Sequence, residues 1–150
     1  MALKLRVVDL DGSLPDQKCF ASRLANGRAK IAKARDLGPG LRVMTSRKEM
    51  ARFCDRLDVS FGKVRKSEND TEVYFYGSGD YHHLTAALIA RTSEPITVIH
   101  FDNHPDWCSF PSFSNCGGWV NRALALPNVQ RVITIGPCSA IPIPLPQAVL

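Results

Sequence analysis

The apolar stretch ITVIHF at residues 96–101 is followed directly by the polar pentapeptide DNHPD at residues 102–106, and the two segments together are the strongest indication of the fold. A nearly continuous apolar run is typical of a strand that is covered on both faces, as in parallel sheets. Three further apolar segments, at residues 5–10, 72–76 and 132–135, also have the composition of strands, and helical segments separate them. Strands that alternate with helices predict an α/β fold with a mainly parallel sheet and helices on both faces.

The segments between these strands contain helix signals. Ser46 followed by Glu49 is a capping box, which marks the start of a helix. Gly38-Pro39-Gly40 ends the preceding helix, a short strand is expected at residues 41–44, and residues 62–71 are expected to form a loop. Four prolines after residue 136 forbid a helix there and disfavour a central strand. The helices are predicted over residues 21–35, 46–57, 82–91 and 117–126.

Length and composition limit the class of protein. The 150 residues predict a single domain, and the apolar fraction of 45% with a charged fraction of 22% excludes collagen-like, coiled-coil and wholly disordered chains. No apolar run reaches the roughly 20 residues of a membrane helix, and the first ten residues lack the apolar centre of a signal peptide. Five cysteines without a C-x-x-C pair argue against a disulfide framework. We therefore expect a cytoplasmic protein without a membrane partner.

The positive charge is concentrated in one segment. Residues 18–66 hold fourteen Lys and Arg residues against four Asp and Glu residues. Helices with solvated charged faces explain this excess, and an anionic partner is the alternative. Aromatic residues are scarce in the segment, so it offers no stacking platform for single strands, and nucleic acid is not expected as a partner.

The pentapeptide after the ITVIHF strand carries the strongest chemical signal. In an open α/β sheet, sites form at the carboxyl ends of the strands, where Asp102, His104 and Asp106 would lie. A fully extended chain would spread the two aspartates over about 13 Å, at roughly 3.3 Å per residue, so the chain must leave the strand here. Two carboxylates and an imidazole suit Mn²⁺, Fe²⁺, Co²⁺ or Zn²⁺. The alternative is an ordinary polar turn at a strand end.

A second motif, GSGDYHH at residues 77–83, lies between a strand and a helix. Its glycines allow a tight turn, and His82 and His83 fall where the helix starts. If the two strands are parallel neighbours, both motifs reach the same edge of the sheet, and this motif supplies a second imidazole to the aspartates. The alternative is a pair of histidines that serves only structure.

The segments GSGDYHHL and VIHFDNHPDW together resemble the arginase–agmatinase (ureohydrolase) family. The resemblance implies a three-layer αβα fold and two Mn²⁺ ions. It also implies that a metal-bound hydroxide hydrolyses a guanidino group of arginine, agmatine or peptidyl arginine to an amine and urea. Alignment on Leu84 makes His82 a metal ligand, with His83 as a substitute because Tyr81 is an insertion. Asp102 would bind both ions, His104 one ion and Asp106 the other, and Asp106 would also act in catalysis by accepting a hydrogen bond from the hydroxide.

The resemblance extends over NCGGWVNRAL at residues 115–124 and covers residues 72–136 in all. Cys116 stands where arginases have a proposed proton-shuttle histidine, and it is a catalytic candidate or else a buried thiol. The family has further acidic ligands downstream, whereas no Asp, Glu or His follows Asp106 here. This implies the N-terminal half of a longer ureohydrolase-like domain, which binds one ion or none and is inactive alone.

The sequence supports two other hypotheses about the function. The segment VVDLDGSL at residues 7–14 resembles the nucleophile loop of haloacid-dehalogenase-type phosphatases, in which Asp9 would attack phosphorus and Asp11 would act as acid, with Mg²⁺ bound. Alternatively, the chain is a non-catalytic metal-binding remnant. The substrate and a homo-oligomeric state are left open by the sequence.

Overall fold

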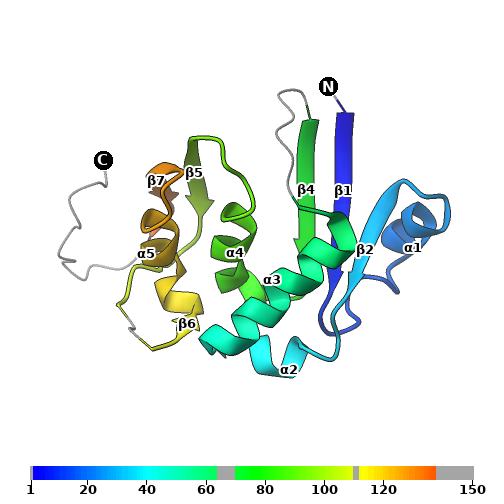
Figure 1. Cartoon of the computed structure of the whole chain (residues 1–150), viewed down its shortest axis with the longest axis horizontal. Coiled ribbons are helices and arrows are strands. Elements are labelled where there is room, and N and C mark those ends of the chain that lie inside the picture. The colour runs from blue at the N-terminus through cyan, green and yellow to red at the C-terminus, as the bar shows by residue number, and fades with distance from the viewer. Residues whose placement is uncertain (1, 64–69, 110–111, 138–150) are drawn as a thin grey trace.

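The computed structural model describes residues 2–63, 70–109 and 112–137 (Figure 1). Strands alternate with helices along these residues, which makes the fold α/β. Within this part of the chain, no helix has the length and apolar character needed to cross a membrane. The elements are β1 (Ala2–Asp9), α1 (Lys18–Ala25), β2 (Ala29–Lys33), α2 (Gly38–Leu41), β3 (Met44–Thr45), α3 (Arg47–Phe61), β4 (Asp70–Tyr76), η1 (Gly79–Leu84), α4 (Thr85–Ile89), β5 (Ile96–Phe101), β6 (Ser114–Asn115), η2 (Cys116–Gly118), α5 (Trp119–Leu124) and β7 (Val129–Ile135).

The first sheet has the strand order β2-β1-β4, and both pairings are parallel. Strand β1 is its centre, and the neighbouring residues Val7 and Val8 are both fully buried although they point to opposite faces. Val8 belongs to a core with Phe53 and Leu57 of α3. On the other face, Phe20 of α1 packs edge-on against Phe75 of β4 with ring centroids 4.8 Å apart. Helices therefore cover both faces of this sheet.

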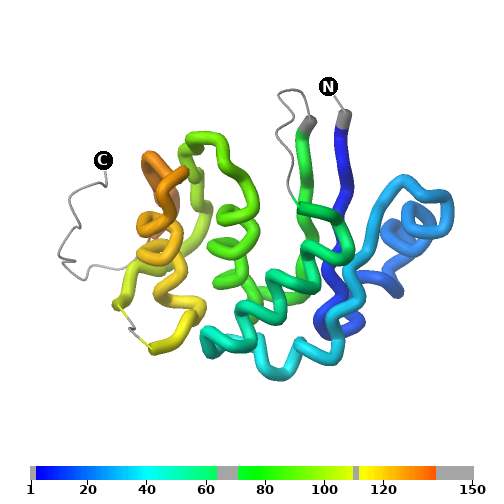
Figure 2. Tube along the Cα trace, viewed as in Figure 1, coloured from blue at the N-terminus to red at the C-terminus, as the bar shows by residue number. Residues whose placement is uncertain are grey.

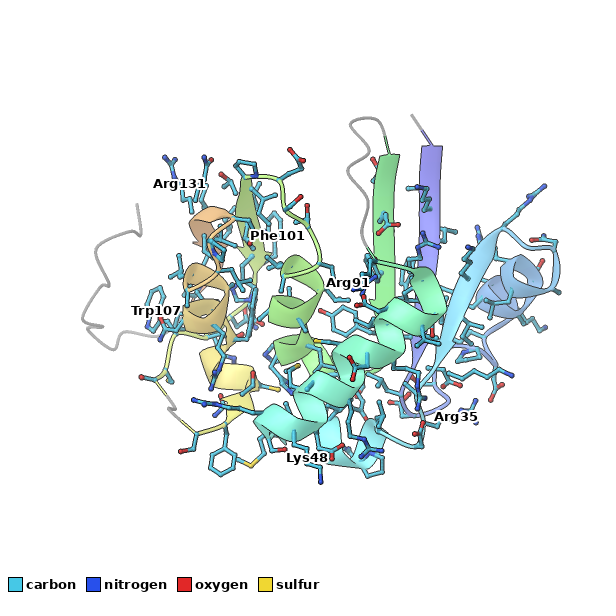
Figure 3. All side chains as sticks on the ribbon, in the orientation of Figure 1. Arg35, Lys48, Arg91, Phe101, Trp107 and Arg131 are labelled. Carbon is cyan, nitrogen blue, oxygen red and sulfur yellow. The ribbon has the colours of Figure 1, made fainter. Side chains whose placement is uncertain are left out.

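The second sheet consists of β5 and β7, which pair in parallel. One face packs on α4 and α5, where Ala86, Trp119, Val120, Ala123 and Val132 form a separate core. The opposite face is open among the described residues: Ile99 is 58% exposed, Phe101 75% and Ile135 49%. Figure 3 shows Phe101 on this sheet. The expectation that helices cover both faces of the ITVIHF strand is therefore not met here.

Strands β4 and β5 belong to different sheets, so the motifs that follow them are not carried by hydrogen-bonded neighbours as expected. The two strands nevertheless run in the same direction in Figure 1. Figure 2 shows how the chain passes from β4 through η1 and α4 to β5. The carboxyl ends of β4 and β5 thus lie on one side of the molecule, and η1 bridges the gap between the sheets.

The prediction of a helix over residues 21–35 is wrong. Helix α1 ends at Ala25, and the chain turns at Gly27, whose φ of 72° is easy only for glycine. Residues 29–33 then form β2, in which Ala29 and Ala32 are buried. Pairing with β1 thus overrides the weak helix preference of the Ala- and Lys-rich composition.

The residues Gly38–Leu41 form the short helix α2, so the expectation that Gly38-Pro39-Gly40 ends a helix is also wrong. The other elements follow the sequence more closely. Ser46 caps α3, because its Oγ accepts a hydrogen bond from the Glu49 backbone N–H at 3.2 Å, as the capping box predicts. The helices predicted over 82–91 and 117–126 are each split into a 3₁₀ turn and a short α-helix. The strand expected at 41–44 is reduced to β3, which pairs antiparallel with β6. The proline-rich tail after residue 137 and most of the loop expected at 62–71 lie outside the described residues.

Candidate metal centre

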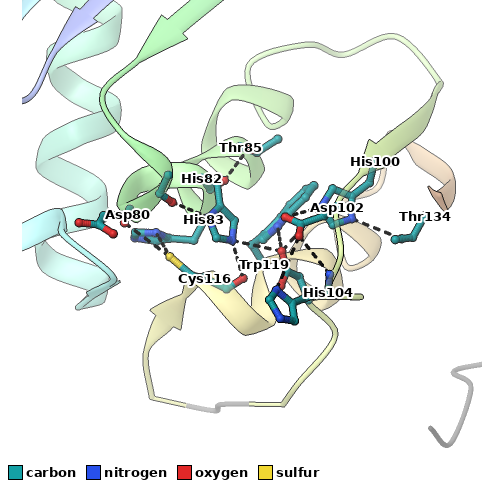
Figure 4. A network of polar contacts seen from close by, with 12 residues as sticks. Asp80, His82, His83, Thr85, His100, Asp102, His104, Cys116, Trp119 and Thr134 are labelled. Carbon is teal, nitrogen blue, oxygen red and sulfur yellow. Dashed lines mark hydrogen bonds and ion pairs between the residues drawn. The ribbon is translucent and has the colours of Figure 1, made fainter. Parts of the chain in front are cut away.

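His82, Asp102 and Asp106 each direct one potential ligand atom into a common cluster, in which all three atoms lie within 4.8 Å of one another. Figure 4 shows His82 and Asp102 with the residues around them. His82 lies in η1, which follows β4 after a short turn. Asp102 directly follows β5, and Asp106 comes four residues later. The cluster therefore joins the end of the first sheet to the end of the second.

Gly77 shapes the turn that leads into η1. Its φ of 58° lies in the left-handed region, and a Cβ at this position would lie only 2.5 Å from the Tyr81 ring atom Cδ2. Tyr81 is buried, and its ring packs directly against the turn. Tyr81 therefore packs against the turn that leads into η1, the 3₁₀ turn that carries His82.

Asp106 is the most firmly held member of the cluster. Its side chain is 5% exposed, and its Oδ2 accepts a hydrogen bond from Trp119 Nε1 at 2.8 Å. Its backbone carbonyl accepts a hydrogen bond from the Val120 N–H at 3.1 Å, and its φ is 52°. A left-handed aspartate is uncommon but sterically accessible. This turn takes the chain out of the β5 direction and brings Asp106 back toward Asp102.

Asp102 is held at the end of β5. Its N–H donates to the Ile135 carbonyl of β7 at 3.2 Å, and its Oδ1 accepts from the His104 N–H at 3.0 Å. Burial raises the pKa of this carboxyl, but the His104 N–H and the nearby His100 and His82 rings outweigh that effect, so the pKa of Asp102 lies below its usual value. The carboxylate is therefore ionised and available to a cation at neutral pH.

His82 places both of its ring nitrogens against acceptors. Nδ1 lies 2.5 Å from the Gly79 carbonyl, and Nε2 lies 3.1 Å from both Asp106 Oδ2 and the Cys116 carbonyl. The hydrogen bond to Asp106 outweighs desolvation and raises the pKa of His82 to about 9. A ring whose Nδ1–H is held by a carbonyl is oriented for metal binding through Nε2. A divalent cation at this point would take the place of the Nε2 proton.

His100 belongs to the surroundings of the cluster, although the sequence analysis did not single it out. It is 8% exposed, and its Nε2 lies 3.5 Å from Asp102 Oδ2 and 3.6 Å from Asp106 Oδ2. Its Nδ1 lies 3.4 Å from Thr134 Oγ1, and its ring meets Trp119 edge-on. Strand parity could have revealed it, because residues 100 and 102 point to the same side of an extended chain.

Of the remaining candidates, His104 and His83 stay outside the cluster. The His104 side chain is 79% exposed, and its Nδ1 lies 3.7 Å from Asp102 Oδ1. His83 is fully buried, where desolvation lowers its pKa to about 4, and its Nε2 has no hydrogen-bond partner among the described residues. The paired histidines thus point to different places, and His82 is the one that meets the aspartates.

Cys116 contributes to the cluster through its backbone. Its carbonyl contacts His82, whereas its thiol lies 3.4 Å from His83 Nδ1 and 3.5 Å from the Asp80 carbonyl. Burial raises the pKa of the thiol, which keeps it protonated at neutral pH. The thiol therefore packs beside His83. Among the described residues, it makes no hydrogen bond to Asp102 or Asp106.

The donor set fits a single divalent ion. One imidazole and two carboxylates leave open coordination positions for water, as in catalytic sites with three protein ligands. The two negative charges balance one divalent cation, whereas two such ions would need further carboxylates. Among the described residues, no further carboxylate belongs to this group.

The second acidic motif is engaged differently. Asp9 is 6% exposed, and its two carboxylate oxygens accept from the Gly12 N–H at 2.9 Å and from Arg35 Nε at 2.7 Å. Asp11 Oδ1 accepts from the N–H and the hydroxyl of Ser13. Both carboxylates therefore stabilise the turn after β1, and no observation here favours the phosphatase reading over this structural role.

Comparison with known proteins gives a limited picture. No protein family matches the chain, and no solved structure does. An uncharacterized protein of Thermotoga maritima is 36% identical over 64 residues, which is 43% of this chain and 26% of that protein. The matched segment thus spans about a quarter of the length of that protein.

Proposed function

We propose that this protein is a metal-dependent hydrolase whose divalent cation is held by His82, Asp102 and Asp106. The convergence of these three ligand atoms within 4.8 Å, from segments that follow two different strands, carries the proposal. The two segments that carry these residues, GSGDYHHL and VIHFDNHPDW, resemble the ureohydrolase family, and this resemblance suggests the reaction. We further propose that the two parallel sheets belong to an arginase-like three-layer αβα arrangement.

The reaction proposed is hydrolysis of a guanidino group to an amine and urea. A bound divalent ion, Mn²⁺ in this proposal, would lower the pKa of a water molecule and polarise the guanidinium carbon. The two carboxylates balance the charge of the ion, so the loaded site would not repel a cationic guanidinium as an uncompensated divalent ion would. Arginine, agmatine and peptidyl arginine all present this group, and the proposal covers the class.

The residues around the cluster have separate tasks in this proposal. The Gly79 carbonyl fixes the His82 ring, and Trp119 Nε1 fixes the Asp106 carboxylate. Asp106 would take a proton from the attacking water and pass it to the amine nitrogen, which leaves as the C–N bond breaks. His100 Nε2 lies 3.5 Å from Asp102 Oδ2 and 3.6 Å from Asp106 Oδ2, so a protonated His100 ring would offset part of the negative charge of both carboxylates. Trp119 and His100 together close the inner side of the cluster to bulk water, because both side chains are buried.

The test measures metal uptake and chemistry separately. Isothermal titration with Mn²⁺ compares the wild type with Asp102→Asn and with Asp11→Asn, an acidic residue of the turn after β1 that serves as a matched control. We expect Asp102→Asn to weaken Mn²⁺ binding about tenfold or more and Asp11→Asn to leave it unchanged. Equal Mn²⁺ binding by the wild type and Asp102→Asn would overturn the proposed centre.

Urea release from arginine, agmatine and an arginine-containing peptide then tests the reaction. We expect Mn²⁺-dependent urea release from at least one of these substrates, with loss of that activity in Asp106→Asn. If Mn²⁺ binds through the three ligands but none of the three substrates releases urea, the protein is the non-catalytic metal-binding alternative.

A further inference from the structure

A cavity of about 540 Å³ lies between α3, α4 and α5 and shares no residue with the metal cluster. Figure 1 shows these three helices one beside another across the molecule. Met50 and Cys54 of α3, Ala86 and Ala87 of α4, and Leu126 after α5 give the cavity an apolar lining. Its volume lies within the range of small-molecule sites, which are mostly apolar with a few placed polar groups.

Two arginines give one part of the lining a positive charge. Arg47 is the first residue of α3, and Arg122 lies in the last turn of α5 and donates to the Phe113 carbonyl at 2.7 Å. Both line the cavity, and no acidic residue is found among the described residues that line it. Arg47 makes no ion pair with any described residue. Guanidinium groups match the planar carboxylate and the phosphate group, which they bind through paired hydrogen bonds.

The amino end of α3 adds to this positive character. The helix is 15 residues long, so its first backbone N–H groups carry the partial positive charge of the helix dipole. Ser46 caps it and also lines the cavity. Glu49, in the first turn, is paired with Arg52 and is not part of the lining. The positive end of the helix thus adjoins the two arginines.

A buried hydroxyl without a partner points independently to a ligand. Ser114 lines the cavity and is 8% exposed, and its Oγ has no hydrogen-bond partner among the described residues. Buried hydroxyl groups in native proteins nearly always have a partner, and those that lack one call for an explanation. The Oγ has almost no accessible surface, so a rotation of the Ser114 side chain about χ1 would be needed to bring the hydroxyl to a ligand oxygen beside the arginines.

We infer that this cavity binds a small amphipathic anion, in which an apolar body carries a carboxylate or phosphate head. The apolar side chains of α3 and α4 contact the body, and Arg47, Arg122 and Ser114 contact the head. The inference does not depend on the proposed hydrolase activity, because the two sites share no residue.

Calorimetric titration at low ionic strength with octanoate, octyl phosphate and octanol tests this site. We expect both anions, or one of them, to bind at a single site about tenfold or more tightly than octanol, which has the same body without the charge. The anion that binds more tightly identifies the head group. Octanol binding as tightly as the better anion would overturn the inference.

Two variants locate the binding. The double variant Arg47→Gln/Arg122→Gln should lose at least about tenfold in anion affinity, whereas the charge-matched control Lys48→Gln/Arg131→Gln should keep it, since neither control residue lines the cavity. Ala90→Phe fills the cavity from an exposed position and should abolish binding with an unchanged circular-dichroism spectrum. Unaltered octanoate and octyl phosphate affinity in Ala90→Phe, or equal losses in the double variant and its control, would refute the site even if one arginine variant fails to fold.

Discussion

The two parallel sheets differ in how they are covered. In β1, Val7 and Val8 are both fully buried, because α1 and α3 lie on opposite faces of the first sheet. In β5, His100 is 8% exposed while its neighbour Phe101 is 75% exposed, because α4 and α5 cover one face only. Strand β5 has no charged residue, whereas β1 contains Lys4, Arg6 and Asp9 beside its buried valines. An apolar run indicates that a strand needs cover on both of its faces. In the second sheet, one face of β5 is not covered by any of the described residues.

The largest expected effect tests this comparison directly. Phe53→Ala removes a fully buried ring from the first core and should lower the free energy of unfolding by about 3–5 kcal/mol. Phe101→Ala removes a ring of the same size from the open face and should change it by less than about 0.5 kcal/mol. Urea unfolding followed by circular dichroism measures both values. A cost for Phe101→Ala close to that of Phe53→Ala would show that the face of β5 is covered.

A smaller effect is expected at the turn that joins the two regions. Gly77→Ala forces an alanine to a φ of 58° and into the Tyr81 ring, and should cost about 1–3 kcal/mol of unfolding free energy. It should also weaken Mn²⁺ binding, because η1 carries His82. Gly79→Ala is the control, since nothing lies within 4 Å of its Cβ position. If both substitutions cost the same, the turn at Gly77 does not set the position of η1.

The smallest expected effect is a pH dependence of the metal-free protein. The pKa of His82 is raised from 6.5 to about 9, so its contribution to stability is complete below pH 6.5 and is lost as the pH rises through 9. The pKa of His83 is lowered from 6.5 to about 4, so its contribution is complete above pH 6.5 and is lost as the pH falls toward 4. Stability should therefore decline on both sides of pH 6.5.

Urea midpoints measured in chelator between pH 4 and pH 10 check this curve. His82→Gln should remove the alkaline decline, whereas His104→Gln, at an exposed position, should leave the curve as in the wild type. An alkaline decline that persists unchanged in His82→Gln would mean that the contact between His82 and Asp106 does not stabilise the fold.

Much of the fold is readable from local sequence signals. The bounds of β5 match the ITVIHF stretch, and Ser46 caps α3 as the capping box predicts. Strand β2 could not be predicted in this way, because alanine and lysine at residues 29–33 favour a helix and only pairing with β1 makes these residues a strand. The separation of β4 and β5 into different sheets could not be predicted either, since periodicity within a segment does not indicate which strands become neighbours.

The candidate site could likewise be predicted only in part, because the sequence gives residue identities but not the path of the chain between them. The identities of His82, Asp102 and Asp106 stand out in the sequence, but the exposure of His104 follows from the turn that begins after Asp102. His100 was not predicted as part of the site, because it lies in an apolar strand, where a histidine is easily taken for a core residue. Its proximity to both carboxylates depends on the left-handed turn at Asp106, which a one-dimensional pattern does not contain.

The left-handed backbone of Asp106 also limits which amino acids this position tolerates over evolutionary time. Aspartate, asparagine and glycine accept that conformation with little penalty, whereas β-branched side chains do not. Aspartate and asparagine codons differ by a single base, so one mutation can exchange a charged side chain for a neutral one of the same shape. A lineage could thus switch the cation affinity of this loop off, and later on again, without rebuilding the surrounding scaffold.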